Sequence, residues 1–128
     1  PRWDADRLWA TMGHLYKGGM WFKKKAYING FNANLAPDGT DFRFGGTNSS
    51  TPSHTLPSAS EINKYFYLPA LGCYSPTNLQ RVGEYGMYWT STASSWSQDS
   101  AFGLQFTSSN VVTIVSPRRY GLRVQAFE

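Results

Sequence analysis

The sequence predicts an α+β domain in which one or two helices pack on a C-terminal antiparallel sheet, with long irregular loops between the elements. Three observations favour this fold class. Apolar residues recur at helical spacing over residues 4–15, a helix-capping motif begins at Ser58, and an alternation of period two dominates after Gly72. We expect a single domain over residues 1–128, because a chain of this length leaves no room for a second core.

The first predicted helix spans residues 4–15, with Asp4 as the candidate N-cap. Its apolar residues are spaced by three or four positions, and they are Ala5, Leu8, Trp9, Met12 and Leu15. Two apolar runs at 20–22 and 26–28 then predict short strands, and the turn-rich residues 29–57 predict a long irregular loop. The N-terminal part, residues 1–55, is therefore expected to hold a helix, short strands and a loop.

The second predicted helix begins the C-terminal part, residues 56–128. The hydroxyl of Ser58 is placed to cap the third amide of the helix, and the side chain of Glu61 is placed to reach back to Ser58. The expected buried stripe comprises Ile62, Tyr65 and Phe66. Pro69 ends this helix, because proline has no amide hydrogen to donate.

Four short runs of period two follow, separated by Ser, Asn, Gly and Pro, and they predict an antiparallel sheet. They cover residues 88–92, 102–106, 111–115 and 121–124. Successive side chains of a strand point to opposite faces. In the second run Phe102, Leu104 and Phe106 therefore share one face, and Gly103 and Gln105 share the other.

Charge and composition exclude several function classes. The net charge of +4 comes mostly from the first 64 residues, where the clearest basic cluster is the short run 23–25. A single such run does not make a nucleic-acid surface, so we expect no nucleic-acid partner. No apolar stretch is long enough to span a membrane, and Cys73 is the only cysteine, which excludes a disulfide framework.

Residues with the spacing of a catalytic or metal site are absent. The sequence has no nucleophile elbow, no phosphate-binding glycine loop and no HExxH motif. His14, His54 and Cys73 have no neighbours at metal-ligand or catalytic spacing. We therefore expect no enzymatic activity, no bound metal and no cofactor.

Six motifs of the chain carry a resemblance to a known family. They are LPSASEI at 56–62, YFYLPALG at 65–72, GEYGMYWTST at 83–92, AFGLQF at 101–106, SNVV at 109–112 and RRYGLRV at 118–124. In this order they resemble the C-type-lectin-like domains of Bacteroidetes surface proteins. These are the Fibrobacter-type paralogous domains, related in fold to formylglycine-generating enzymes. The resemblance implies a C-type-lectin-like fold.

Several domains of that family are variable proteins of diversity-generating retroelements, in which adenine-directed mutagenesis rewrites outward-facing positions. The resemblance implies an adhesin or receptor module at a pilus tip, on a cell surface or on a phage particle. Its partner would be a protein or glycan on another cell or surface, with pilus or tail components as assembly partners.

We expect the ligand-binding residues to form one contiguous exposed face, comprising Met87, Trp96, Gln98, Gly103, Gln105, Val112, Ile114, Arg119 and Tyr120. The expected framework is Trp89, Leu104, Phe106, Val111, Gly121 and Val124. The stretch 89–117 that holds most of the expected face has Asp99 as its one charged residue and is rich in Ser and Thr. Aromatic rings and hydroxyls on a charge-poor surface are typical of adaptable binding sites.

Two departures from the family limit what can be carried over. The EPN, QPD and WND triplets that bind calcium in animal C-type lectins are absent, so binding is expected to be calcium-independent. One cysteine cannot provide the reactive pair of formylglycine-generating enzymes, so an enzyme of that kind is the disfavoured alternative. A structural pilin or phage tail subunit that uses the same face for assembly is the other alternative.

Overall fold

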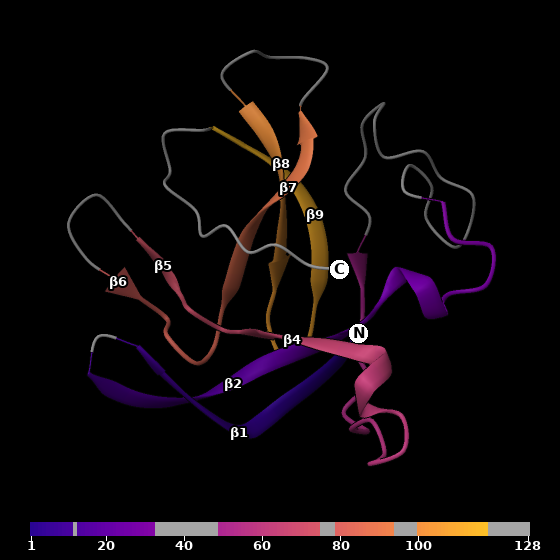
Figure 1. Cartoon of the computed structure of the whole chain (residues 1–128). Helices are drawn as coiled ribbons and strands as arrows, with labels where there is room; N and C mark the ends of the chain where they lie inside the picture. Colours follow the sequence, from indigo (N-terminus) through magenta and orange to yellow (C-terminus); the bar gives the residue numbers. More distant parts are fainter. Residues whose placement is uncertain (12, 33–48, 75–78, 94–99, 118–128) are drawn as a thin grey trace.

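The computed structural model describes residues 1–11, 13–32, 49–74, 79–93 and 100–117. In these residues the chain forms strands, turns and short 3-10 helices (Figure 1). The elements in chain order are β1 (Arg2–Thr11), β2 (His14–Lys23), η1 (Lys25–Tyr27), β3 (Ser49–Ser50), η3 (Ile62–Lys64), β4 (Tyr65–Pro69), β5 (Cys73–Tyr74), β6 (Leu79–Gln80), β7 (Gly86–Ala93), β8 (Ser100–Phe106) and β9 (Val111–Pro117). No helix in the described part of the chain has the length and apolar character needed to cross a bilayer.

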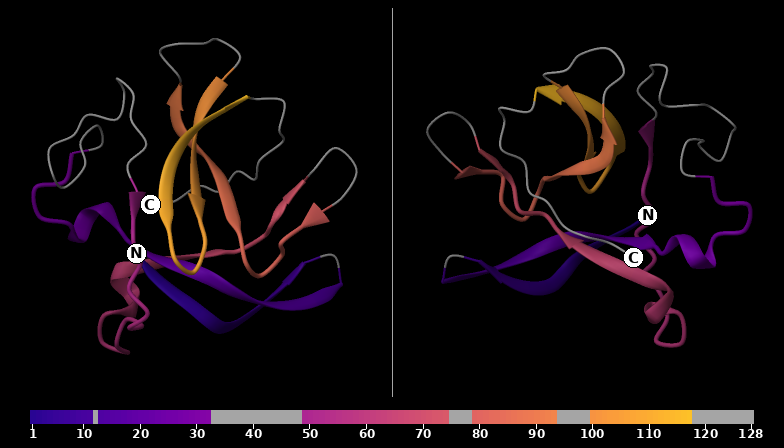
Figure 2. Two further views of the ribbon diagram at one scale, coloured as in Figure 1. Left: turned by 180° about the vertical axis from the view of Figure 1, so that it is seen from behind. Right: turned by 45° about the horizontal axis from the view of Figure 1, so that its top comes forward.

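The strands form two main antiparallel sheets. One has the order β1-β2-β4, and the other has the order β3-β9-β8-β7, in which β3 adds only two residues. The strands β7, β8 and β9 stand across those of the β1-β2-β4 sheet (Figures 1 and 2). A separate short ribbon pairs β5 with β6.

The core lies between the two main sheets and takes residues from both. Its buried members are Trp3, Met20, Leu68, Ala70, Tyr88, Phe106 and Val111. The ring of Phe22 joins the two sides, with its centroid 5.8 Å from the rings of both Phe66 and Phe106. Burying aromatic and aliphatic side chains from both sheets is the main force that holds them together.

The helix predicted over residues 4–15 is wrong, because this segment belongs to the β1-β2 hairpin. The residues that defined the helical stripe do not share a buried face: Leu8 is 65% exposed and Leu15 is 70% exposed. Trp9 instead stacks across the hairpin on Tyr16, at 5.3 Å between ring centroids. Gly13 allows the reversal between the strands through its positive φ of 78°.

The helix predicted from Ser58 is also wrong, although one turn forms there. The carbonyl of Ser58 accepts hydrogen bonds from the amides of Glu61 and Ile62. The chain then extends into β4, because the consecutive aromatic residues Tyr65, Phe66 and Tyr67 favour a strand. Phe66 and Leu68 pair with Phe22 and Met20 of β2 and belong to or pack against the core.

Three of the four strands predicted near the C-terminus fall within β7, β8 and β9 and pair in the expected antiparallel sense. The fourth, at 121–124, lies outside the described residues. Because the described residues contain strands and 3-10 turns but no α-helix, the predicted α+β class, with helices packed on a sheet in a C-type-lectin-like arrangement, is wrong. The described part of the chain is a β protein.

Candidate functional site

The strands β7, β8 and β9 present one face to the core. Tyr88, which is 1% exposed, and Phe106, which is fully buried, stack with ring centroids 6.2 Å apart. The Tyr88 hydroxyl donates to the carbonyl of Pro69 at 2.6 Å, which ties β7 to the end of β4. This packing anchors the core-facing side of the sheet.

The opposite face of these strands holds five of the nine predicted ligand-binding residues. Met87 pairs with Gln105, and Gln105 pairs with Val112, so the three positions form one row across the sheet. Gly103 pairs with Ile114 in the next row. Since opposite residues of an antiparallel pair share a face, the register makes these five positions contiguous.

The exposure of this face is smaller than the sequence suggests. Met87, Gln105 and Val112 are half-buried, and Gly103 is buried. Gly103 lies on β8, between β9 and β7, and has no side chain. At this position only the backbone contributes to the face. The side chain of Ile114 lies outside the part that the structure describes.

The other predicted residues are not placed. Trp96, Gln98, Arg119 and Tyr120 lie outside the described residues, as does the side chain of Trp89. The backbone of Trp89 pairs with Gly103, in register with the candidate face, while its neighbour Tyr88 fills the core position that the alternation predicted for Trp89.

A second feature, which no sequence pattern predicted, is a pocket where the two sheets meet. It has a volume of about 420 Å³ and is lined by Trp3, Arg81, Gly83, Glu84, Thr107, Ser108 and Ser109. We call it the junction pocket. Its residues come from three segments that lie far apart in the chain, so no local sequence pattern predicts the pocket. The only local signal is the run of three hydroxyl residues at 107–109, which is also what a simple turn would show.

The outer face of the β1-β2-β4 sheet carries a buried carboxylate. Asp4 is 7% exposed and accepts three hydrogen bonds of 3.0 Å, from the backbone amides of Asp6 and Arg7 and from the indole Nε1 of Trp21. Burial raises the pKa of Asp4, but these hydrogen bonds and the charge of Arg7 outweigh it and hold the pKa below its usual value. The hydrogen bonds from the two backbone amides stabilise an irregularity in β1 between Asp4 and Leu8.

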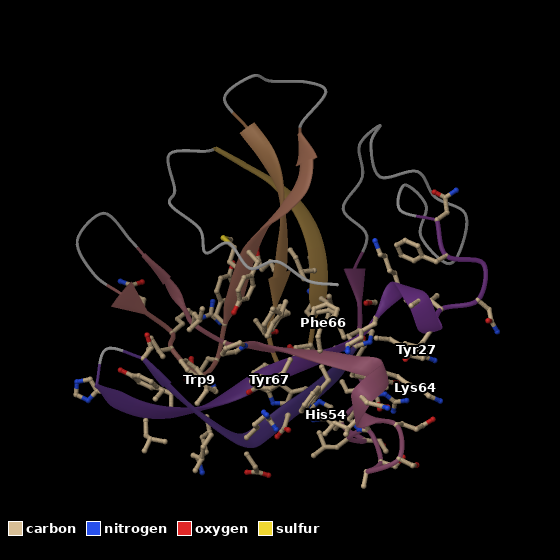
Figure 3. The ribbon with its side chains drawn as sticks, in the orientation of Figure 1. Trp9, Tyr27, His54, Lys64, Phe66 and Tyr67 are labelled. Atoms are coloured by element: carbon tan, nitrogen blue, oxygen red, sulfur yellow. The ribbon has the colours of Figure 1, made fainter. Side chains whose placement is uncertain are left out.

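This irregularity places Arg7 over the aromatic rings of the same face. The guanidinium carbon lies 4.9 Å from the ring centroid of Trp21 and 5.2 Å from that of Tyr67. Figure 3 shows Tyr67 on this sheet, and its buried hydroxyl has no hydrogen-bond partner among the described residues. The outer face of the β1-β2-β4 sheet is thus closed by the chain's own charged groups.

Comparison with known proteins identifies a family but not an activity. A family model described as a domain of unknown function, DUF8237, matches residues 57–127, which is more than half of the chain. The chain therefore belongs to this family. No curated protein and no solved structure matches it. The matched segment contains all of β7, β8 and β9 and every residue that lines the junction pocket except Trp3.

Proposed function

We propose that this member of the DUF8237 family is a ligand-binding module of the adhesin or receptor type. The row of Met87, Gln105 and Val112 would contact the ligand, without calcium and without catalysis, and the positions of Gly103 and Ile114 continue the same face. The module would act on a cell surface or a phage particle, and its partner would be a protein or a glycan on another surface.

The observation that carries this proposal is the separation of the two faces of β7, β8 and β9. Tyr88 and Phe106 fill the core on one side, while the row of Met87, Gln105 and Val112 lies on the other. A change at the outer row therefore leaves the core contacts of these strands in place. Binding sites built on strands are also held more precisely than sites on loops.

The chemistry of the face supports contact with varied partners. Its described residues are neutral and combine a flexible thioether, an amide and a branched aliphatic group. Such residues adapt to different surfaces by packing and by hydrogen bonding. We propose further that sibling copies of this domain differ at these positions, as variable proteins of diversity-generating retroelements do.

The first test is genetic. We expect a near-identical non-coding repeat beside the gene that differs from it at adenines, together with a reverse transcriptase gene nearby. Differences among siblings should fall at the five positions of the face and spare Tyr88 and Phe106. A sequence that is constant at the five positions would reject diversification and favour a structural subunit that assembles through the same face.

The second test is biochemical and uses the whole chain on arrays of glycans and of surface proteins. The triple variant Met87→Ala, Gln105→Ala, Val112→Ala should lose array binding while it still folds and unfolds cooperatively, because the core contacts of Tyr88 and Phe106 stay in place. The control is Leu15→Ala, which removes an exposed apolar side chain from the other sheet and should bind as the parent does. Binding that survives in the triple variant would overturn the assignment of this face.

A further inference from the structure

The junction pocket is built by contacts that bring three distant segments together. The amide of Trp3 donates to the carbonyl of Ser53 at 2.8 Å, which attaches β1 to the segment before η3. In the same segment, His54 Nε2 lies 2.9 Å from the carbonyl oxygen of Ser108. The β8-β9 turn is thereby held beside β1, with the largely buried Trp3 among the residues that line the pocket.

Hydroxyl groups form one wall of the pocket. Thr107 Oγ1 lies 3.3 Å from Ser109 Oγ and accepts the amide of Ser109 at 3.3 Å. The amide of Thr107 donates to the carbonyl of Asn110 at 2.8 Å and closes the turn. Ser108 and Ser109 are exposed at this wall, where their hydroxyls can both donate and accept.

A cation and a carboxylate line the pocket as well. Arg81 and Glu84 lie in the turn before β7, and neither forms an ion pair with another residue of the described part. Within the described part of the chain, the two opposite charges are thus left without an ionic partner at the pocket. A ligand that matches them needs an anionic group for Arg81 and hydrogen-bond donors for Glu84.

The position of Arg81 is unusual. Its φ is 57°, in the left-handed region that side chains other than glycine rarely adopt, and such strain is concentrated at functional sites. Its carbonyl accepts the amides of Glu84 and Tyr85, both at 3.1 Å. Its guanidinium carbon lies 4.9 Å from the centroid of the Tyr85 ring, which restrains the side chain before any ligand arrives.

We propose that the junction pocket binds a sugar acid, that is, a sugar ring that carries a carboxylate. The planar guanidinium of Arg81 would take the carboxylate through two parallel hydrogen bonds. Glu84 and the hydroxyls of Thr107, Ser108 and Ser109 would bind the ring hydroxyls. A pocket of about 420 Å³ falls within the usual range for small-molecule sites and accommodates a ligand of this size.

Other ligands match the pocket less well. A neutral sugar leaves Arg81 without an anion, and the second negative charge of a phosphate increases the repulsion by Glu84 beyond that met by one carboxylate. A free amino acid matches both charges, but its ammonium and carboxylate leave the hydroxyls of Thr107, Ser108 and Ser109 without the partners that a sugar ring offers. This inference shares no residue with the proposed binding face, so either can fail without the other.

The test is a titration of the isotope-labelled whole chain, followed by nuclear magnetic resonance. The probes are sodium glucuronate, glucose, glycine and inorganic phosphate. Glucuronate should shift the indole resonance of Trp3 and the amides of Gly83, Ser108 and Ser109, with an affinity at least about tenfold above that for glucose. No shift with glucuronate, or equal or tighter binding of glucose, glycine or phosphate, would overturn the proposal.

Variants at Arg81 test the proposed bidentate contact between its guanidinium and the ligand carboxylate. Asn tolerates the left-handed conformation better than most residues, so Arg81→Asn should fold and lose the preference for glucuronate over glucose. Arg81→Lys keeps the charge without the planar fork and should retain an intermediate preference. The matched control is Lys25→Gln, which removes an exposed cation outside the pocket and should not change affinity. A folded Arg81→Asn variant with unchanged preference would reject the role of Arg81.

Discussion

The two main sheets share one core, but they differ in what lies on their other faces. On the β1-β2-β4 sheet, Asp4 is buried in hydrogen bonds and Arg7 covers the rings of Trp21 and Tyr67. On the β7-β8-β9 sheet, the described side chains of the outer row are neutral and half-buried, and they carry none of the charged contacts seen on the other sheet.

This difference indicates where binding can occur at low cost. A ligand on the β1-β2-β4 sheet would have to displace a guanidinium from two aromatic rings, and so would forfeit a favourable contact of the folded chain. Among the described side chains of the β7-β8-β9 sheet, a ligand would displace no such group. On the described side chains, the β7-β8-β9 sheet is therefore the better candidate for contact with partners.

The largest expected effect contrasts the two faces of a single strand, β8. Phe106→Ala removes a fully buried ring that packs on Phe22 and Tyr88, and it should lower the free energy of unfolding by about 3–5 kcal/mol. Gln105→Ala, at the adjacent position on the other face, should cost less than about 1 kcal/mol. Denaturant unfolding of both variants measures the contrast, and equal losses would mean that the two faces do not differ.

The second effect concerns the junction between the sheets. A Cβ atom at Gly18 would collide with the carbonyl oxygen of Gly83, in the turn that leads into β7, and the φ of Gly18 is 104°. We expect Gly18→Ala to cost about 3 kcal/mol or more, through strain and overpacking together.

Gly13→Ala is the matched control for this junction. Gly13 also has a positive φ, 78°, but a Cβ atom added there would have no neighbour within 4 Å, so only the backbone cost of about 1–2 kcal/mol applies. Thermal or denaturant unfolding compares the two variants. If Gly18→Ala costs no more than Gly13→Ala, the backbone of Gly18 does not need to lie so close to the carbonyl oxygen of Gly83 for the two sheets to pack.

Sequence patterns predicted the elements whose signals are local. The alternation of residues 102–106 correctly placed Phe106 in the core, because period two is itself the geometry of a strand. Pattern reasoning failed at the N-terminus, where the spacing from Ala5 to Leu15 matches a helix by coincidence. The segment is instead a strand of a local hairpin, in which Trp9 pairs with Tyr16 and Thr11 pairs with His14. The hairpin joins a sheet through the pairing of Trp21 with Tyr67, and a local window cannot contain that second pairing.

The candidate sites show the same limit. The row of Met87, Gln105 and Val112 follows from alternation within each strand, so the sequence could propose it. The junction pocket joins Trp3, Arg81 and Ser108, which become neighbours only when both sheets are assembled. No spacing rule applies to residues that far apart, and only the fold reveals them.

The third effect tests whether Asp4 fastens the outer face of the β1-β2-β4 sheet. Because its folded pKa lies below the value of about 3.9 expected in the unfolded chain, its ionisation stabilises the fold above that value. This contribution is lost as the pH falls through the folded pKa. Asp4→Asn should cost about 1–3 kcal/mol at pH 7, and the gap to the parent should narrow on acidification below about pH 4.

The control for this acid effect is Asp6→Asn, which removes an exposed carboxylate two residues away. Unfolding free energies measured across the acid range should follow the parent closely for Asp6→Asn. A gap between Asp4→Asn and the parent that stays constant from neutral pH down to about pH 2 would show that the carboxylate charge does not hold this face.

The smallest effect compares two tyrosines, one from each sheet, and here the expected signs differ. The Tyr88 hydroxyl donates to the carbonyl of Pro69, so Tyr88→Phe should lower the free energy of unfolding by about 1 kcal/mol. Burial raises the pKa of Tyr67 to about 12, with a further rise from the charge of Asp4 that Arg7 partly offsets, and its hydroxyl lacks a partner in the described part of the chain. Tyr67→Phe keeps the ring under Arg7 and removes the unpaired hydroxyl, so it should leave stability unchanged or raise it by up to about 1 kcal/mol.

Denaturant unfolding curves of Tyr88→Phe and Tyr67→Phe, each paired with the parent, resolve this difference in sign. A loss at Tyr67 as large as that at Tyr88 would mean that the Tyr67 hydroxyl is hydrogen-bonded in solution. The outer face of the β1-β2-β4 sheet would then be accessible to a polar partner.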